Sequence, residues 1–147
     1  LIPMVTTEDD VVEIAAELHA LAGDMGIREL PRLGAMIETP AAALSIPVLK
    51  QHVDFFSIGS NDLTQYTMAA GRESSTVVEY FINDHPAILR LIELVVRESG
   101  ETPVCLCGEL AGRIEVLPGV LKTGIRSLSV AVSLVPDVKN AIRNSSA

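Results

Sequence analysis

Polar residues that could support catalysis follow three short apolar runs in this chain. Cys107 ends the run PVCLC, Glu38 follows GAMI, and Ser60, Asn61 and Asp62 follow DFFSIG. A thiol held at the end of a strand can act as a nucleophile or as a general acid. A free cysteine is also among the residues most often simply buried. The spacing therefore makes Cys107 a candidate catalytic residue and leaves its role open.

The two carboxylates of this set close successive strands. Neighbouring parallel strands lie about 4.8 Å apart, so side chains at their ends can converge on one ion. Glu38 and Asp62, with water and ligand oxygens, would suit Mg²⁺, which keeps positions open for a phosphorylated substrate. The alternative is that each is a solvated acid at a strand end or a helix cap.

Two further residues could hold phosphate oxygens beside such an ion. Asn61 offers an amide and Arg72 a guanidinium, which binds phosphate in a bidentate manner. Taken singly, Asn61 could equally cap a helix and Arg72 could be a surface charge. Cys105 is expected to alternate to the other face of its strand and is given no role.

Apolar runs alternate with segments of helical periodicity along the chain. The expected strands are LIPMVTT, RLGAMIET, VDFFSIGS, TPVCLCG and RSLSVAV, and the clearest expected helices cover residues 8–22, 41–50, 85–98, 114–122 and 135–144. This order is typical of parallel β-α-β units, either in an open doubly wound sheet or in part of a barrel. Polar residues at the strand ends favour the barrel. We predict a single α/β domain over residues 1–147 with about five units of a (β/α)8 barrel.

Composition excludes several classes of protein. The chain has 147 residues, 48% of them hydrophobic, and a formal net charge of −8. An acidic chain is repelled by nucleic acids and anionic membranes, so neither is an expected partner. No apolar run approaches the roughly 20 residues of a membrane span. Two cysteines separated by one residue make a poor disulfide framework, which favours a reduced, cytoplasmic location.

Three motifs in one order carry a resemblance to a known family. GAMIETPAAAL, VDFFSIGSNDLTQYTMAAGR and CLCGELAG resemble the phosphoenolpyruvate-binding barrel of the phosphoenolpyruvate-utilising enzymes. That family includes Enzyme I (phosphoenolpyruvate-protein phosphotransferase) of the bacterial phosphotransferase system, pyruvate phosphate dikinase and phosphoenolpyruvate synthase. Tyr66 and its spacing to Arg72 look most like Enzyme I, of the sugar branch or of a nitrogen-related paralogue.

The resemblance implies a role for each candidate residue. Glu38 and Asp62 match the family's Mg²⁺ ligands, Asp62 also facing the substrate. Asn61 and Arg72 match residues that contact phosphate. Cys107 matches the general acid that protonates C3 of the enolpyruvate. The phosphoryl group passes to a histidine in another domain and then to a small phosphocarrier protein of the HPr type, pyruvate is released, and the enzyme is a homodimer.

The resemblance also implies that this chain is a fragment, the C-terminal portion of the barrel. The family's first strands supply two arginines that grip substrate, and His19, His52 and His85 sit in no matching context, so they are read as surface or packing residues. We therefore expect the isolated chain to be inactive and to cover its open sheet edges by self-association. A dikinase or synthase and a non-catalytic dimerisation or regulatory piece remain the alternatives. Arg113 and Gly71 depart from the family pattern, which commonly has Asp at both positions.

Overall fold

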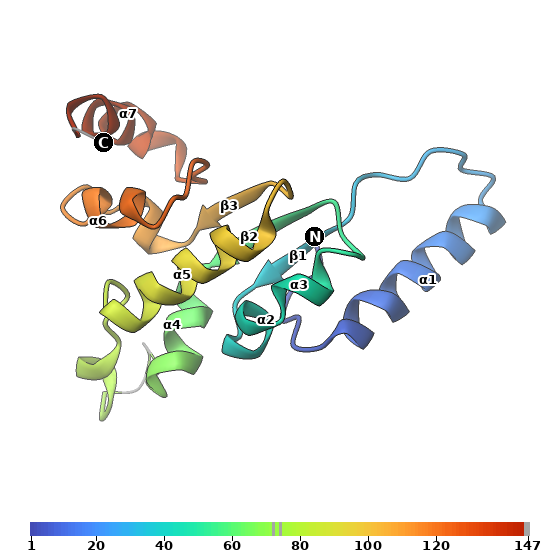
Figure 1. Ribbon diagram of the computed structural model, residues 1–147, viewed down its shortest axis with the longest axis horizontal. Helices are drawn as coiled ribbons and strands as arrows, with labels where there is room; N and C mark the ends of the chain where they lie inside the picture. The colour runs from blue at the N-terminus through green and yellow to red at the C-terminus, as the bar shows by residue number, and fades with distance from the viewer. Residues whose placement is uncertain (72, 74, 146–147) are drawn as a thin grey trace.

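A parallel sheet forms the centre of the computed structural model, which describes residues 1–71, 73 and 75–145 (Figure 1). Its strands are β1 (Gly34–Ile37), β2 (Phe55–Gly59) and β3 (Val104–Cys107), in the order β1-β2-β3. In register, Ile37 of β1 lies beside Ile58 of β2, and Gly59 of β2 lies beside Cys107 of β3. All three strands therefore end at the same edge of the sheet.

Two of the five expected strands are reduced to single bridges. At one edge Ile2 pairs with Ala35, and at the other Leu128 pairs with Leu106. The first segment is short because Pro3 has no N–H to donate and Met4 then turns into the left-handed region, with φ 54°. The five segments nevertheless follow one another across the sheet in chain order, so the expected α/β arrangement of a partial barrel is confirmed.

The strands are linked by helices whose bounds follow the proline positions. The α-helices are α1 (Glu8–Asp24), α2 (Pro40–Leu44), α3 (Ile46–Leu49), α4 (Ser60–Met68), α5 (Pro86–Ser99), α6 (Leu117–Lys122) and α7 (Val135–Asn144), and short 3-10 helices are η1 (Val78–Tyr80), η2 (Glu109–Gly112) and η3 (Val132–Leu134). The expected helix 41–50 is divided at Ser45, with Pro47 in the first turn of α3. The expected helix 114–122 begins only at Leu117, because Pro118 is accommodated in a first turn.

One face of the sheet packs against helices and forms the core. Alternate residues of the strands point to that face and are fully buried, namely Ala35, Ile37, Phe56, Ile58 and Leu106. Helix α5 covers this face, contacting α2, α3 and α4 (Figure 1). The opposite face of the sheet carries Ser57, Gly59 and Cys107, which belong to the candidate site.

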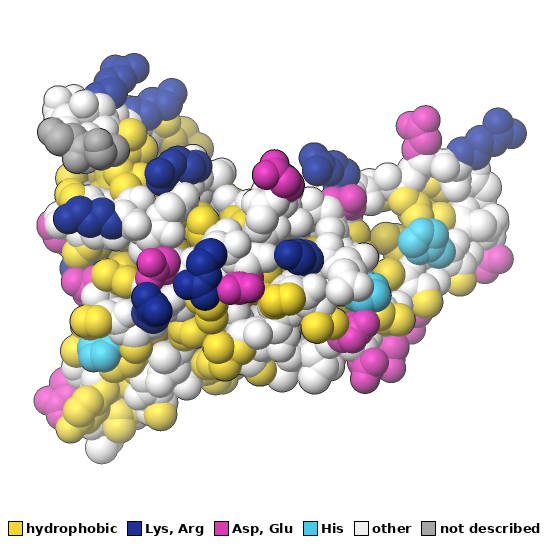
Figure 2. All heavy atoms as spheres, in the orientation of Figure 1, with side chains coloured by type: hydrophobic (Ala, Val, Ile, Leu, Met, Phe, Trp, Pro, Cys, Tyr) yellow, Lys and Arg dark blue, Asp and Glu magenta, His cyan; other side chains and the backbone are white. Residues whose placement is uncertain are grey.

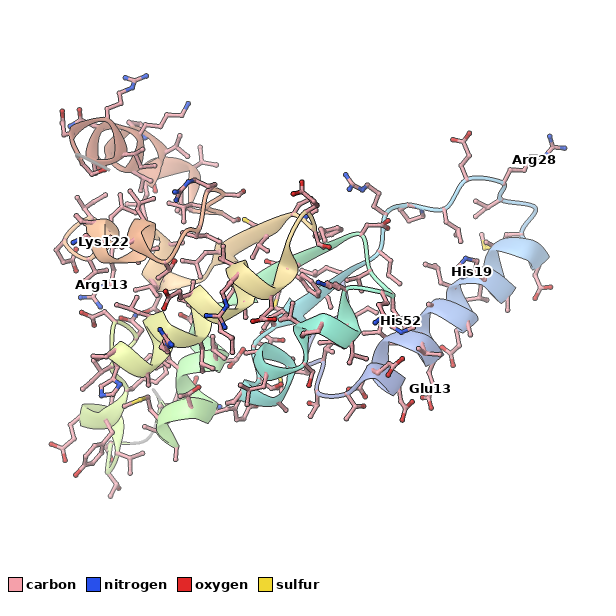
Figure 3. The ribbon with its side chains drawn as sticks, viewed as in Figure 1. Glu13, His19, Arg28, His52, Arg113 and Lys122 are labelled. Carbon is pink, nitrogen blue, oxygen red and sulfur yellow. The ribbon has the colours of Figure 1, made fainter. Side chains whose placement is uncertain are left out.

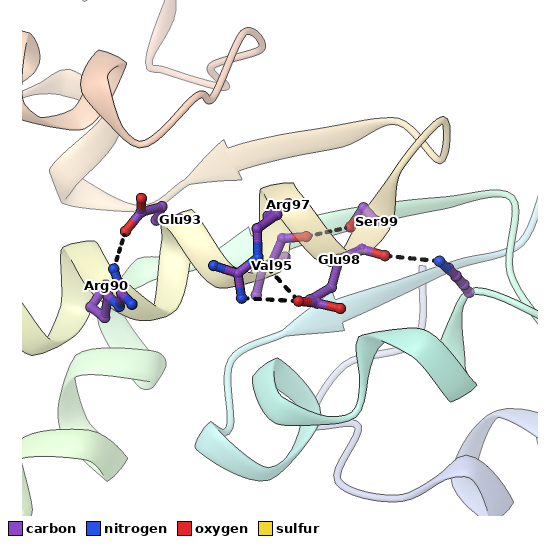
Figure 4. A network of polar contacts seen from close by, with 7 residues as sticks. Arg90, Glu93, Val95, Arg97, Glu98 and Ser99 are labelled. Atoms are coloured by element: carbon purple, nitrogen blue, oxygen red, sulfur yellow. Dashed lines mark hydrogen bonds and ion pairs between the residues drawn. The ribbon is translucent and has the colours of Figure 1, made fainter.

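The outer surface of α5 is polar. Arg90 pairs with Glu93 at 2.9 Å, and Arg97 donates to Glu98 at 2.9 Å (Figure 4). The Glu98 carbonyl accepts a hydrogen bond of 3.0 Å from Nζ of Lys50, which ties α5 to the end of α3. These exposed pairs contribute little to stability.

Helix α1 extends away from the rest of the molecule, at the end opposite α7 (Figure 1). Its first turn is fixed by the Asp10 carboxylate, which accepts hydrogen bonds of 2.8 Å from the N–H groups of Thr6 and Thr7 and has a lowered pKa for that reason. Acidic side chains gather along α1 (Figure 2). No helix among the described residues is long and apolar enough to cross a membrane.

Candidate active site at the ends of the strands

Glu38 is a buried carboxylate held by a strained backbone. It follows β1 directly and is only 4% exposed. Its Oε1 accepts a hydrogen bond of 2.7 Å from the N–H of Met4, one of two non-glycine residues with positive φ in the part of the chain that the structure describes. Burial raises the pKa of Glu38, and the nearby Asp62 adds to the increase, whereas the Met4 N–H opposes it. The carboxylate therefore lies where ionisation is unfavourable unless a cation compensates it.

Asp62 reaches the same place from the first turn of α4. Gly59, the last residue of β2, makes room for the pair, since a Cβ at this position would lie 2.7 Å from Oε2 of Glu38. The structure thus brings together the two carboxylates that the sequence placed at adjacent strand ends. Carboxylate oxygens at a strand end are the ligands that Mg²⁺ prefers.

The described residues contain no group of three or more His, Cys, Asp or Glu side chains that could hold a metal ion. An ion bound to Glu38 and Asp62 would therefore need further ligands from water or from a bound substrate. Mg²⁺ is usually held by one or two carboxylates and completes its shell with water and substrate oxygens.

Cys107 lies at the neighbouring strand end and is half-buried. Its Sγ donates a hydrogen bond to the Ile58 carbonyl at 3.3 Å and accepts one from Oγ of Ser57 at 3.5 Å. Cys105 lies in register with Ser57, two residues before Cys107. The prediction that Cys105 points to the other face is wrong, because residues two apart in a strand share a face, and Leu106 between them is the fully buried one.

Two hydrogen bonds connect the first turn of α4, which follows β2, to the turn after β3. Oγ of Ser60 donates to the Cys107 carbonyl at 2.7 Å, and the N–H of Glu109 donates to Oδ1 of Asn61 at 3.1 Å. Gly108 allows this approach with φ 88°, since a Cβ there would lie 2.3 Å from Oγ of Ser60. Asn61 is therefore not the cap of α4, whose N-cap is Gly59. It lies beside the Cys107 turn.

Arg72 and the three histidines are not among the residues that the structure places in this cluster. Arg72 lies outside the residues that the structure describes. The histidines are surface or packing residues, as expected: His19 bonds the Ala15 carbonyl at 2.6 Å, His52 pairs with Glu8 at 2.8 Å, and His85 accepts from the N–H of Ala87 at 3.2 Å at the start of α5.

Sequence reasoning missed two residues that shape the site, Met4 and Ser57, and gave Ser60 no role of its own. Ser57 could have been found, because it lies two residues before Gly59 on the face that points away from the core. Met4 gave no local signal, since its N–H meets Glu38 only through the pairing of residues 2 and 35.

Comparison with known proteins decides the family. The family model "PEP-utilising enzyme, PEP-binding domain" matches residues 1–147. The chain belongs to this family. A phosphoenolpyruvate-protein phosphotransferase of Haloferax volcanii is 38% identical over 97% of this chain, and one of Mycoplasma genitalium is 41% identical over 90%. A probable phosphoenolpyruvate synthase of Methanocaldococcus jannaschii is 34% identical over 97% of the chain.

The matched region is a small part of each relative. The chain spans 26% of the Haloferax protein, 24% of the Mycoplasma protein and 12% of the Methanocaldococcus protein. The resemblance to the phosphoenolpyruvate-utilising enzymes is confirmed. As a PEP-binding domain, this chain carries its cluster of polar residues on the side of the sheet where β1, β2 and β3 end, the side on which barrel enzymes bind substrate.

Proposed function

We propose that this chain forms the magnesium- and phosphoenolpyruvate-binding part of a phosphoenolpyruvate-protein phosphotransferase. The observation that supports the proposal best is the buried Glu38 carboxylate at the end of β1 beside Asp62, which follows β2, with the Cys107 thiol at the end of the next strand, β3. In the whole enzyme, a cytoplasmic homodimer, the phosphoryl group would pass to a histidine of another domain and on to a small phosphocarrier of the HPr type. The product would be pyruvate.

Glu38 and Asp62 would hold the Mg²⁺ ion. Both offer oxygen ligands, and Gly59 leaves space beside Glu38 that any larger residue would fill. When bound, the ion would act as a Lewis acid that stabilises the negative charge developing on the substrate oxygens. Asn61 and Arg72 would contact the phosphate, the guanidinium in a bidentate manner.

Cys107 would supply the proton that converts the enolpyruvate to pyruvate. The Sγ–H bond breaks, a C–H bond forms at C3, and the sulfur is left as a thiolate. In the structure the thiol donates to the Ile58 carbonyl at 3.3 Å, so the S–H bond must turn about Cβ–Sγ before it can donate to the substrate. The hydroxyl of Ser57, 3.5 Å from Sγ, can then donate to the thiolate.

Calorimetry of oxalate binding tests the proposal, because oxalate mimics the enolate of pyruvate. The unaltered chain should bind oxalate only with Mg²⁺ present, and Glu38→Gln should abolish this binding. The matched control is Glu17→Gln, which removes an exposed carboxylate on α1 and should bind as the unaltered chain does. Binding that survives Glu38→Gln or needs no Mg²⁺ would contradict the proposal.

A phosphoenolpyruvate synthase is the second candidate, favoured by the 34% identity to the Methanocaldococcus protein. Both reactions would use the same carboxylate pair and thiol, so the site does not separate them. The phosphoryl acceptor separates the two reactions, because a whole enzyme that transfers phosphate to a phosphocarrier protein is a phosphotransferase. For the chain by itself we expect no phosphoryl transfer, since it offers no histidine in a suitable context.

A further inference from the structure

Helix α1 carries an apolar stripe that its own chain leaves exposed. The stripe consists of residues spaced three and four positions apart along the helix and its C-cap, namely Ile14, Leu18, Leu21 and Met25. Ile14 is 42% exposed, Leu21 58% and Met25 71%. Single exposed apolar side chains are ordinary on a protein surface, whereas a continuous row of them indicates a contact surface.

A groove at the other end of the molecule offers a second apolar surface. It lies between α6, α7 and the segment 126–130 and has a volume of about 280 Å³. Its apolar lining consists of Leu121, Leu128, Val130, Val135, Val138 and Ile142. Of the residues of α7, all of which the structure describes, only Val138 is buried, and Ile142 is 40% exposed. Much of the apolar side of α7 is therefore exposed beside the groove.

The charges beside these two surfaces are opposite. The residues that border the α1 stripe on one side are Glu13, Glu17 and Asp24. The basic residues at the groove are Arg126 and Lys139, which line it, and Arg143, one turn beyond Lys139 on α7. None of these six side chains forms an ion pair within the part of the chain that the structure describes, so their charges are available to a partner.

The two surfaces lie at opposite ends of the molecule. Figure 2 shows acidic side chains along α1 and Lys and Arg side chains around α7. Figure 3 labels Glu13 on α1 at one end and Lys122 on α6, which contacts α7, at the other. The chain cannot bring its own α1 to its own groove in this arrangement, so the complementary surface must come from another molecule.

We propose that α1 of one copy of this chain docks in the groove between α6 and α7 of a second copy. The α1 stripe packs on the apolar lining, and its acidic border faces the basic residues of the groove. Two copies in antiparallel orientation place each α1 at the other copy's groove, so both contacts form in one closed dimer. This contact rests on the homodimer of the proposed function, gives it a surface, and uses none of the residues that would hold Mg²⁺ or substrate.

Charge reversal tests the contact by analytical ultracentrifugation. The unaltered chain should sediment as a dimer whose Kd rises with the NaCl concentration, because the opposed charges lie at the surface. Reversing the α1 border (Glu13→Lys with Glu17→Lys) or the groove (Lys139→Glu with Arg143→Glu) should raise the Kd at least about tenfold, since like charges then face each other. The matched control is Arg90→Glu with Arg97→Glu on the exposed side of α5, which changes the net charge as the groove variant does and should leave the Kd unchanged.

Mixing the two reversed chains gives the decisive result. In the mixture a basic α1 meets an acidic groove, and the acidic α1 of the other chain meets a basic groove. The mixture should therefore form a heterodimer about as tightly as the unaltered chain forms its homodimer, although each reversed chain alone does not. An unaltered chain that is monomeric at millimolar concentration, a Kd that neither reversal changes, or a mixture that stays monomeric would each overturn the proposal.

The apolar part of the contact has a test of its own. Leu21→Gln should raise the Kd at least about tenfold at an unchanged far-ultraviolet circular dichroism spectrum, because Leu21 is exposed in the single chain. Leu44→Gln, which alters a leucine on α2 that is 65% exposed, should not change the Kd. A Leu21→Gln dimer as tight as that of the unaltered chain would refute docking through the α1 stripe.

Oxalate binding with Mg²⁺ separates this proposal from the proposed function. A monomeric chain that binds oxalate would refute the dimer contact and leave the metal site standing. A dimer that responds to the charge reversals but binds no oxalate would support the contact and refute the metal site.

Discussion

Replacing Glu38 by Gln should stabilise the chain while destroying its proposed metal site. The carboxylate is buried, lies near Asp62 and has a raised pKa, so its ionised form costs folding free energy at neutral pH. Glutamine has nearly the same shape, carries no charge, and can still accept the hydrogen bond from the N–H of Met4.

The magnitude follows from two opposing terms. Removing the buried charge and its repulsion by Asp62 should gain about 1–2 kcal/mol. Exchanging a charge-assisted hydrogen bond from Met4 for a neutral one should lose about 0.5–1 kcal/mol. The net gain is on the order of 1 kcal/mol, which raises the melting temperature of a chain of this size by about 2–4 °C.

The pH dependence has a definite sign. A raised pKa in the folded state means that the protonated form of Glu38 is favoured there. The free-energy cost of burying the ionised carboxylate is therefore absent below the ordinary pKa of 4.5 and complete above the folded-state pKa. The stability gain of Glu38→Gln should therefore increase as the pH rises above about 4.5, level off above the folded-state pKa, and vanish as the pH falls to about 4.5. Urea denaturation of both chains without Mg²⁺, at several pH values, measures it.

Adding ligand should reverse the order of stability. Mg²⁺ and oxalate at about 100 times their Kd should stabilise the unaltered chain by about 2.7 kcal/mol and leave Glu38→Gln unchanged. A Glu38→Gln chain that is less stable than the unaltered chain at neutral pH without metal would refute the reasoning. It would mean that the carboxylate contributes more through its hydrogen bond than it costs by its burial.

Three further substitutions test the backbone that frames the site. Gly108→Ala should destabilise the chain by at least about 2 kcal/mol in urea denaturation, because φ is 88° and the new Cβ would lie 2.3 Å from Oγ of Ser60. The control is Gly23→Ala on the open surface of α1, which should stabilise the chain by about 0.5–1 kcal/mol. Ser60→Ala should cost about 1 kcal/mol, read by the same method, by removing its hydrogen bond to the Cys107 carbonyl. Ala69→Gly should raise the melting temperature, since φ at this position is 51°, and a decrease would show that the αL turn carries no strain.

Most of the fold was predictable because its signals are local. Strands and helices alternate with clear periodicity, and the prolines mark where helices begin, as Pro47 and Pro118 do in the first turns of α3 and α6. The convergence of Glu38 and Asp62 was predictable as well. Side chains that close adjacent parallel strands must lie close together, whatever the details of the connections.

The remaining features depend on contacts between distant segments. The N–H of Met4 reaches Glu38 across 34 positions, and Arg113 reaches Asp84 across 29. No periodicity in the sequence encodes such a contact. The error at Cys105 had another origin: the period of two was applied to residues that are themselves two apart, so they had to share a face.

The left-handed backbone conformations and the buried charge that frame the candidate site lie close together in this structure. Met4 has a left-handed backbone, Glu38 is a buried carboxylate beside another acid, and Gly108 takes a φ that other residues avoid. All three lie where β1 and β3 end, while the strands behind them are packed with fully buried apolar side chains. Strain and unfavourable charge persist only where the surrounding structure enforces them. A domain that served only as packing or as a dimer contact would gain stability by losing the left-handed backbone at Met4 and the buried charge at Glu38, so their proximity favours a ligand site over a purely structural role.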